Sequence, residues 1–337
     1  MNLLHWSKKS SQVRIIDLPN SSTTPPRLLI FTAFAAVYIL WGATYLGIRF
    51  AVEVLPPFLM VGTRFLIAGF ILYLWARLSG APRPDLSHWK SAAIVGLLML
   101  VFGNGLVSWA EQKIPSGLAA LTVATIPFWM VMLDWMRPRG TVPSSKVVLG
   151  LIIGFVGVSL LFQPWHSAEE SKYYLPGIAM LLVAAISWAT GSLYSVRAKF
   201  PSSPVLSTGM EMLSGGLIAL LVGTFRGELA NIEVASITAR SLLALTYLIL
   251  FGSLAGFSAY MWLLRVCTPA WVSTHAFVNP VVAVFLGWAL GGESLTASTL
   301  VAASLIVISV FFITFCNPRN GSFTELRRNR MKEDKIT

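Results

Sequence analysis

Long uninterrupted runs of apolar residues are the feature that most limits what this chain can fold into. Residues 300–315 read LVAASLIVISVFFITF, and several other stretches of similar length carry few or no charges. An apolar run of about 18 residues or more can cross the hydrocarbon core of a bilayer as a helix. Strands of a membrane barrel would alternate apolar and polar residues, and the quoted run does not. The sequence therefore predicts a bundle of membrane-spanning α-helices.

Ten candidate spans can be marked along the 337 residues, with short connections between most of them. Only 12% of the residues are charged, against roughly 25% in soluble proteins, so the apolar runs are not the buried cores of soluble domains. We predict an all-α integral membrane protein. The predicted spans cover residues 28–50, 57–77, 91–111, 116–136, 146–163, 177–197, 205–225, 241–263, 269–291 and 296–316.

The positive charges gather on one side of these spans. The loops on the other side hold only Lys113, Lys172, Arg226 and Arg240, while Arg49 and Arg64 lie within spans. Loops on the cytoplasmic side of a membrane carry an excess of Lys and Arg, so this asymmetry predicts that both termini are cytoplasmic. It also explains the net charge of +11 without a nucleic-acid partner.

The two ends of the chain are polar. Residues 1–27 lack the order of charge, apolar core and small-residue cleavage site that marks a signal peptide, and we expect a cytoplasmic tail there. Residues 317–337 form a second, basic tail. The two cysteines, Cys267 and Cys316, lie near cytoplasmic helix ends, where a structural disulfide is not expected.

The chain repeats itself. At an offset of 147 residues Trp41 aligns with Trp188, and at an offset of 153 residues Gly103 aligns with Gly256. Trp, Pro and Gly seldom match in register by chance, so we interpret the pattern as a duplication. Each half contains five spans, and an odd number makes the second half enter the membrane from the opposite side. The prediction is two inverted five-helix repeats, an arrangement typical of secondary transporters. Further matches are Pro57 with Pro204, Gly62 with Gly209, Gly69 with Gly216, Trp109 with Trp262, Pro127 with Pro280 and Trp135 with Trp288.

Four stretches carry a family resemblance: LWGATYLGIRF, PPFLMVGTRFLIAGF, GLAALTVATIPFWMVML and NPVVAVFLGWALGGESLTASTLVAASLIVISV. In this order they resemble the two EamA repeats of the drug/metabolite transporter superfamily, here at 28–163 and 177–316. The resemblance implies ten transmembrane helices, a cavity between the first four helices of each half, and alternating access. It also implies that the fifth and tenth helices pack at the side. Family members move amino acids, amines, drugs and other small metabolites, often outward.

Two charged residues occupy the same position of the two repeats. Arg64 and Glu211 both lie within predicted spans, where a charged group costs about 2.5–3.5 kcal/mol. Three explanations for Arg64 stay open: it holds an anionic substrate in the central cavity, it pairs with Glu211 in one transport state, or its long stem carries the guanidinium to the headgroups.

The ninth span adds further polar candidates. His275 lies about as far into its span as Arg64 does, and its titration range would suit proton coupling, although a lone histidine in a helix is more often a hydrogen-bonded packing residue. Pro127 and Pro280 are expected to interrupt the fourth and ninth helices and to free a backbone carbonyl. Asn279 directly precedes Pro280.

Aromatic residues complete the predicted substrate-binding set. Trp41, Tyr45, Trp109, Trp188 and Tyr260 can line an aromatic cavity, although tryptophan also anchors helices at headgroup depth. We predict that the substrate-binding residues are Trp41, Tyr45, Arg64, Asn104, Trp109, Trp188, Glu211, Tyr260, His275 and Asn279.

These features favour a secondary transporter, and an exporter in particular, of a small organic metabolite, amino acid, amine or drug in the cell's inner membrane. A lipid-carrier flippase subunit is the alternative within transport. An integral-membrane enzyme or a scaffold is less well supported, because no set of catalytic residues has suitable spacing. No cofactor, metal or catalytic residue is expected. The expected partners are a small molecule, the lipid bilayer and a coupled proton, and the sequence leaves a homodimer open.

Overall fold

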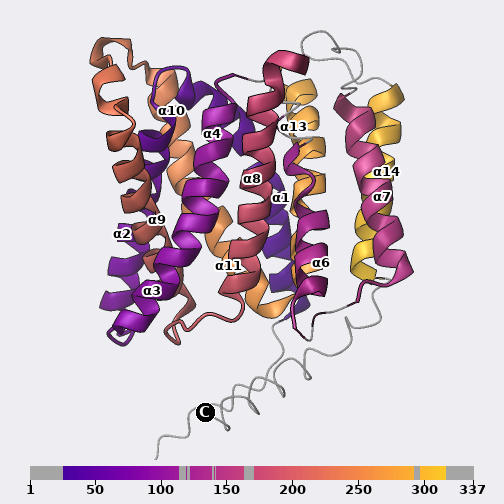
Figure 1. The fold of residues 1–337 in the computed structure, drawn as a ribbon, viewed down its shortest axis with the longest axis horizontal. Helices are drawn as coiled ribbons and strands as arrows, with labels where there is room; N and C mark the ends of the chain where they lie inside the picture. Colours follow the sequence, from indigo (N-terminus) through magenta and orange to yellow (C-terminus); the bar gives the residue numbers. More distant parts are fainter. Residues whose placement is uncertain are drawn as a thin grey trace, which may run out of the picture.

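The computed structural model describes residues 26–113, 119, 122–138, 140, 142–162, 171–291 and 297–315. Within them the chain is all-helical, and ten helical segments run between the two ends of one bundle (Figure 1). Six of these segments are long and apolar enough to cross a membrane. We call the end where α1 begins and α14 ends the lower end, as drawn in Figure 1, and the opposite end the upper end. Both predicted tails fall almost entirely outside the described residues.

The first half contributes five segments. The bounds of its helices are α1 Arg27–Val52, α2 Pro57–Leu78, α3 Leu86–Val95 continued by η1 Gly96–Gly105 and α4 Leu106–Ala110, α6 Ile126–Met136 and α7 Ser145–Phe162. Proline begins α2, where its missing N–H costs nothing because the first amides of a helix have no partner within the helix.

The second half contributes five more. Their bounds are α8 Ser171–Ser195, α9 Pro204–Phe225, α10 Ala239–Tyr247 continued by η5 Leu248–Phe257 and α11 Ser258–Val266, α12 Pro269–Val272 with α13 His275–Gly291, and α14 Ala297–Phe315. Two short 3₁₀ turns, η3 Glu228–Asn231 and η4 Val234–Ser236, lie between α9 and α10. Most helices begin and end within a few residues of the predicted spans.

The third and eighth segments differ from the prediction. Each extends several residues beyond one end of its predicted span, and each contains a ten-residue π-helix at its centre, η1 and η5. A π-helix is wider than an α-helix and is frequently found at functional sites. Hydropathy reports the length of an apolar run but not its hydrogen-bond pattern, so the sequence could not reveal these two stretches.

The expected proline breaks are also in different places. Pro127 lies in the first turn of α6, just after a turn at Ala124 and Thr125. Pro280 lies inside α13, which continues through it, and the break instead separates α12 from α13 at Ser273 and Thr274. The prediction that Pro280 interrupts the ninth helix is therefore wrong. The chain turns about two helical turns before the proline.

The two halves meet most closely along α2 and α9. A Cβ on Gly69 would come within 2.7 Å of the Leu213 backbone nitrogen, and a Cβ on Gly216 would come equally close to that of Leu66. Only glycine permits this approach, and small residues commonly bring membrane helices together. The repeat equates Gly69 with Gly216 and Leu213 with Leu66, so these two contacts are equivalent. We call this symmetric contact between α2 and α9 the seam. Equivalent pairs recur elsewhere: α1 packs on α13 as α8 packs on α6.

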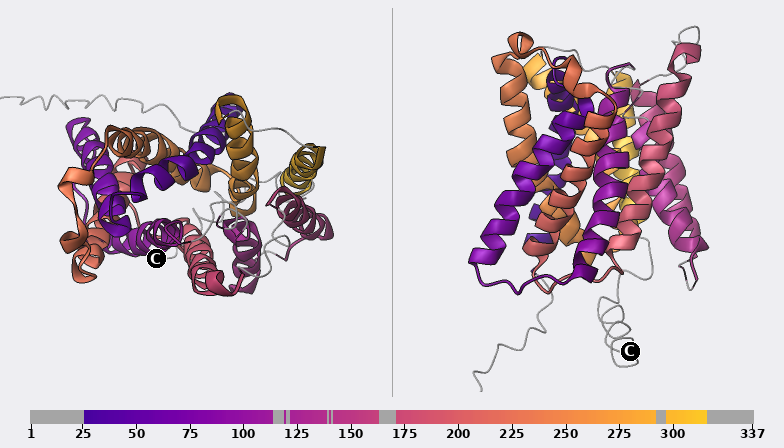
Figure 2. Two further views of the ribbon diagram at one scale, coloured as in Figure 1. Left: turned by 90° about the horizontal axis from the view of Figure 1, so that it is seen from above. Right: turned by 60° about the vertical axis from the view of Figure 1, so that its left-hand side comes forward.

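The fifth and tenth helices, α7 and α14, pack on each other at one side of the bundle (Figures 1 and 2). Gly150 and Gly157 of α7 face Ile313 and Ile306 of α14. The resemblance to the transporter repeats implied this lateral position, and the contacts of the two helices confirm it.

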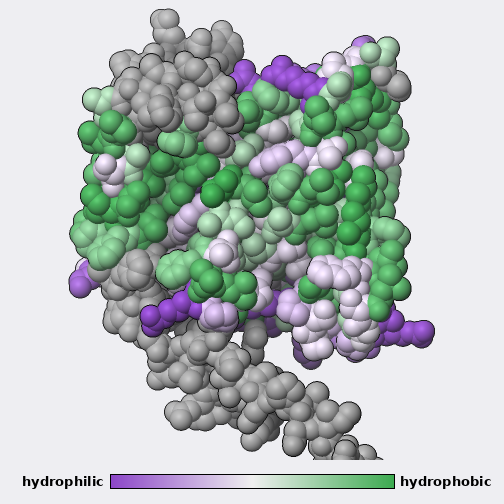
Figure 3. Space-filling model, turned by 180° about the vertical axis from the view of Figure 1, so that it is seen from behind, coloured by the Kyte–Doolittle hydropathy of each residue, from purple (hydrophilic) through white to green (hydrophobic). Residues whose placement is uncertain are grey.

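The outer surface of the bundle suits a bilayer. Figure 3 shows a broad hydrophobic band between hydrophilic residues at the upper and lower rims. Exposed apolar side chains such as Phe70 and Ile152 contribute to the apolar exterior. Among the described residues the cations concentrate at the lower end. These are Arg27, Arg77, Arg83, Lys90, Arg137, Lys146, Arg197, Lys199 and Arg265.

Candidate functional site

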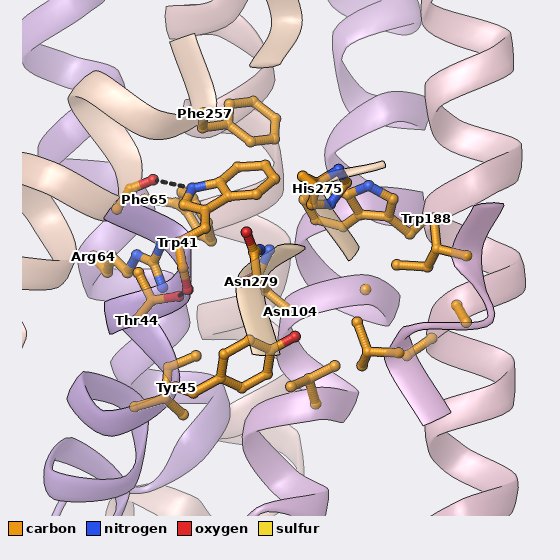
Figure 4. A pocket seen from close by; sticks show the side chains of 18 residues that line it. Trp41, Thr44, Tyr45, Arg64, Phe65, Asn104, Trp188, Phe257, His275 and Asn279 are labelled. Carbon is orange, nitrogen blue, oxygen red and sulfur yellow. Dashed lines mark hydrogen bonds between the residues drawn. The ribbon is translucent and has the colours of Figure 1, made fainter. Parts of the chain in front are cut away.

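A cavity lies in the middle of the bundle, with a volume of about 660 Å³ that includes its part open to solvent (Figure 4). Along α1 its lining runs from Trp41 to Ile48, which is one turn below the upper end of that helix. The cavity thus occupies the middle and upper part of the bundle.

Both halves of the chain line this cavity. The first half supplies Trp41, Thr44, Tyr45, Ile48, Arg64, Phe65, Gly103, Asn104, Val107, Val123 and Ile126. The second half supplies Ala184, Ala185, Trp188, Gly252, Phe257, His275 and Asn279. A relative movement of the halves must therefore change the cavity.

Arg64 is the cation of this lining, and it is 3% exposed. Its Nε donates to the Ser253 hydroxyl at 2.6 Å, and its guanidinium carbon lies 4.7 Å from the centre of the Phe65 ring. Nη1 is buried without a hydrogen-bond partner. Gly252 makes room for the group, because a Cβ there would lie 2.8 Å from Nη2. A guanidinium has five donors, so this arginine retains hydrogen-bonding capacity toward the cavity.

The two tryptophans that match in the sequence occupy equivalent places. A Cβ on Gly256 would lie 2.5 Å from the indole nitrogen of Trp41, and a Cβ on Gly103 would lie 2.8 Å from the Trp188 ring. Each tryptophan of one half therefore rests on a glycine of the other half. This contact explains why Trp and Gly match in register between the repeats.

Below the cavity the aromatic rings form a closed cluster. Trp41, Trp188, Tyr260 and His275 have ring centres 5.1–5.5 Å apart. The Trp188 indole donates to the Tyr260 hydroxyl at 3.0 Å, and the Trp41 indole donates to the Gly252 carbonyl at 2.9 Å. The Tyr260 and Ser192 hydroxyls share a further bond of 2.8 Å. The cluster lies between the cavity and the lower end.

His275 begins α13 within this cluster. Its Nδ1 lies 3.0 Å from the Val272 carbonyl oxygen. A carbonyl only accepts, so Nδ1 must carry a hydrogen, and Nε2 of the neutral ring is then left as the acceptor. Asn279 ties α13 to α1: with its amide oriented to satisfy both neighbours, its nitrogen donates to the carbonyls of His275 at 3.0 Å and Tyr38 at 3.3 Å.

Seven of the ten predicted site residues line the cavity: Trp41, Tyr45, Arg64, Asn104, Trp188, His275 and Asn279. Three do not. Tyr260 lies beneath the lining in the aromatic cluster. Trp109 lies near the upper end, with Lys113 Nζ 4.6 Å and the Arg226 guanidinium carbon 6.0 Å from its ring centre. The third is Glu211.

Glu211 is fully buried in α9, and neither of its carboxylate oxygens has a hydrogen-bond partner. The charge that acts on it is Arg265, at the lower end of α11. Arg64 bonds to Ser253 instead, and no ion pair between Arg64 and Glu211 is formed in this structure. The repeat relates the two sequence positions, but their surroundings differ, since Leu100 stands where the other half has Ser253.

Sequence reasoning missed the lining residues Gly252 and Phe257, and it missed Ser253, which lies outside the lining and accepts from Arg64. Phe257 matches Asn104 at the offset of 153 residues, so extending the repeat alignment to dissimilar residues would have found it. Gly252 and Ser253 lie in the π-helix η5 and carry no comparable signal. No group of acidic, histidine or cysteine side chains in the described residues could hold a metal ion.

Comparison with known proteins now identifies the family. Residues 28–163 and 175–315 each match the EamA-like transporter family. The chain belongs to that family. It is an integral membrane protein of a transporter family and not an enzyme.

EamA relatives are similar along nearly the whole chain. The inner membrane transporter YedA of Escherichia coli K12 is 39% identical over 289 residues, which cover 85% of this chain and 91% of the relative. The transporter YoaV of Bacillus subtilis is 25% identical, with 85% and 97% covered. A solved crystal structure covers 87% of this chain with a TM-score of 0.69 at 19% identity. That likeness bears on the EamA fold alone.

Proposed function

We propose that this EamA protein is a secondary transporter that exports a small organic metabolite by alternating access between two inverted five-helix repeats. The observation that carries the proposal is the central cavity, which is lined by both halves and closed below by a shared aromatic cluster. Inverted repeats allow two related conformations that open to opposite sides of a membrane.

The cations at the lower end support placing that end, with both termini, in the cytoplasm. The cavity then lies toward the outer face, and the aromatic cluster of Trp41, Trp188, Tyr260 and His275 separates it from the cytoplasm. The described conformation would be the outward-facing one, from which an exported substrate is released.

A gradient is the proposed energy source, and His275 is the proposed proton-coupling residue. Its Nε2 is available to a proton, and the ring centres of Trp41 and Tyr260 lie 5.1 and 5.2 Å from the centre of its ring. A charge placed on this ring would alter the cluster that closes the cavity. Proton binding and opening toward the cytoplasm would thereby be linked.

Flux in proteoliposomes tests the proposal. The purified protein is reconstituted and offered a panel of labelled metabolites, with and without a pH gradient. We expect saturable flux of at least one small molecule and a dependence of that flux on the gradient. Protein-free vesicles are the control. Lipid scrambling without metabolite flux would overturn the proposal in favour of a flippase.

A further inference from the structure

We infer that the cavity selects an organic anion in preference to an amine or an amino acid, and that Arg64 binds the carboxylate of this anion. The rest of the ligand would be an aromatic or compact apolar group. This inference rests on the proposed transport function. It concerns only which small molecules the cavity binds.

The first argument is the unmet capacity of Arg64. The guanidinium is held by Ser253 through Nε and lies against Phe65, so its orientation is fixed before any ligand binds. Nη1 is left buried and unpartnered, and the residue lines the cavity. A buried cation without a counterion is costly, and a bound carboxylate would provide the missing acceptor. The planar fork of arginine suits a carboxylate in particular.

The second argument is the absence of a counterpart for an ammonium group. No Asp or Glu is among the described residues that line the cavity. Glu111, near the upper end, acts on the lining residue Tyr45, and its carboxylate oxygens have no hydrogen-bond partner, but it lies outside the lining and Arg49 acts on its charge. An amine or the ammonium of an amino acid would thus meet the positive charge of Arg64 with no acid in the described lining to offset it.

The third argument is the shape of the remaining lining. Trp41, Phe65, Phe257 and Trp188 present apolar rings, and their contacts with one another fix their positions. Asn104 and Asn279 carry the amides of the described lining, and the bond of Asn104 to the Met99 carbonyl is long at 3.4 Å. A ligand that is apolar except for one carboxylate matches this distribution better than a polar one.

Calorimetric titration of the purified full-length protein tests the inference with four probes of one body: phenylacetate, phenylacetamide, phenethylamine and phenylalanine. We expect phenylacetate to bind at least about ten-fold more tightly than the other three, as one charge-assisted hydrogen bond predicts. Arg64→Gln should abolish this preference, and Arg64→Lys should retain only part of it, because lysine lacks the bidentate fork.

Two further variants keep the test decisive. Arg240→Gln removes an exposed arginine of α10 outside the lining and should leave the preference intact. Ser253→Ala releases Nε and should weaken phenylacetate binding even if Arg64→Gln fails to fold. Equal or tighter binding of phenethylamine or phenylalanine, no saturable phenylacetate binding at millimolar concentration, or an unchanged preference in folded Arg64→Gln would each overturn the inference.

Flux measurements separate this inference from the proposed function. Preferential binding of phenylacetate without flux of any labelled metabolite would support the anion site and contradict transport. Flux of an amine or amino acid without a preference for anions would support transport and contradict the anion site.

Discussion

Arg64 and Trp41 both owe their positions to glycines on the opposite half of the chain. Gly252 leaves space for the guanidinium and Gly256 leaves space for the indole. Both glycines lie on one face of η5, one turn apart. At the residue scale, these two glycines therefore shape the cavity as much as the side chains that line it.

Gly256→Ala should impair transport without unfolding the protein. The added Cβ would lie 2.5 Å from Trp41 Nε1, so the indole must move and lose its bond to the Gly252 carbonyl. We expect flux to fall about ten-fold, as loss of one buried hydrogen bond suggests. Adding Trp41→Phe removes the clashing nitrogen and should restore part of the flux. A double variant as impaired as Gly256→Ala would show that the indole is not the cause.

His275→Gln should change the pH dependence of transport while expression and binding persist. Histidine is the side-chain type of the aromatic cluster that can bind and release a proton during transport, and glutamine keeps hydrogen-bonding capacity without a titration. Flux of the wild type should depend on pH, and flux of the variant should be flat. His88→Gln, at the surface start of α3, is the matched control. Identical profiles for wild type and His275→Gln would return this histidine to a packing role.

Residue identity alone located much of this site. Trp41, Trp188 and Asn279 drew attention because aromatic and amide groups deep in a membrane are informative, and all three line the cavity. Glu211 was misleading for a physical reason: the repeat equates positions, whereas a site depends on neighbours, and only Arg64 has Ser253 and Gly252 beside it.

At the scale of elements, the seam between α2 and α9 is the closest contact of the two halves. Gly69→Ala and Gly216→Ala place a methyl group against equivalent backbone atoms, both at 2.7 Å. Overpacking costs about 1–3 kcal/mol, and we expect the two variants to lower the melting temperature in detergent by similar amounts. Leu74→Ala, which shortens an exposed side chain of α2, should have little effect. Unequal losses would contradict a symmetric seam.

A second element contact joins η3 to the start of α2. The Glu228 carboxylate accepts from the backbone N–H groups of Phe58 and Leu59, both at 3.0 Å. Burial raises the pKa of this carboxyl, and the two backbone hydrogen bonds and Arg226 offset only part of the rise. The cap holds the upper end of α2, the helix that carries Arg64, against the other half.

The pKa of Glu228 has a consequence for stability. A carboxyl whose pKa is higher in the folded state binds its proton more tightly there, so ionisation destabilises the fold as pH rises above about 4.5, the ordinary value. We expect the melting temperature of the wild type to fall with rising pH relative to Glu228→Gln. The exposed Glu233→Gln should not differ from wild type in this slope. Parallel slopes for wild type and Glu228→Gln would contradict the raised pKa.

Helix positions were predictable because a bilayer imposes the length of an apolar run. The π-helices η1 and η5 and the break before His275 were not. They depend on hydrogen bonds and on packing between halves, which leave no mark on hydropathy. Five residues of the described lining, Gly103, Asn104, Gly252, Phe257 and His275, lie on or beside these irregular stretches, so this part of the cavity's shape was missed by sequence reasoning.

At the scale of the whole molecule, the orientation in the membrane decides which side the cavity faces. Reporter fusions in the loop near Lys172 and at the C-terminus should report opposite sides, with the C-terminus cytoplasmic, because the cations gather at the lower end. A fusion in the connection between α2 and α3 should agree with the C-terminus. Reporters near Lys172 and at the C-terminus on the same side would contradict the inverted topology.

The symmetric contact between α2 and α9 also bears on how the sequences of the two halves diverged. In a dimer of identical five-helix chains, every substitution at a two-fold interface appears twice, so an arginine at the position of Arg64 would bring a second arginine at the position of Glu211. A fused chain is free of this constraint. Arg64 with Ser253 on one side, and Glu211 with Leu100 on the other, is an asymmetry that a dimer of identical chains cannot have. Joining the halves therefore allowed a symmetric frame to hold an arginine on one side only.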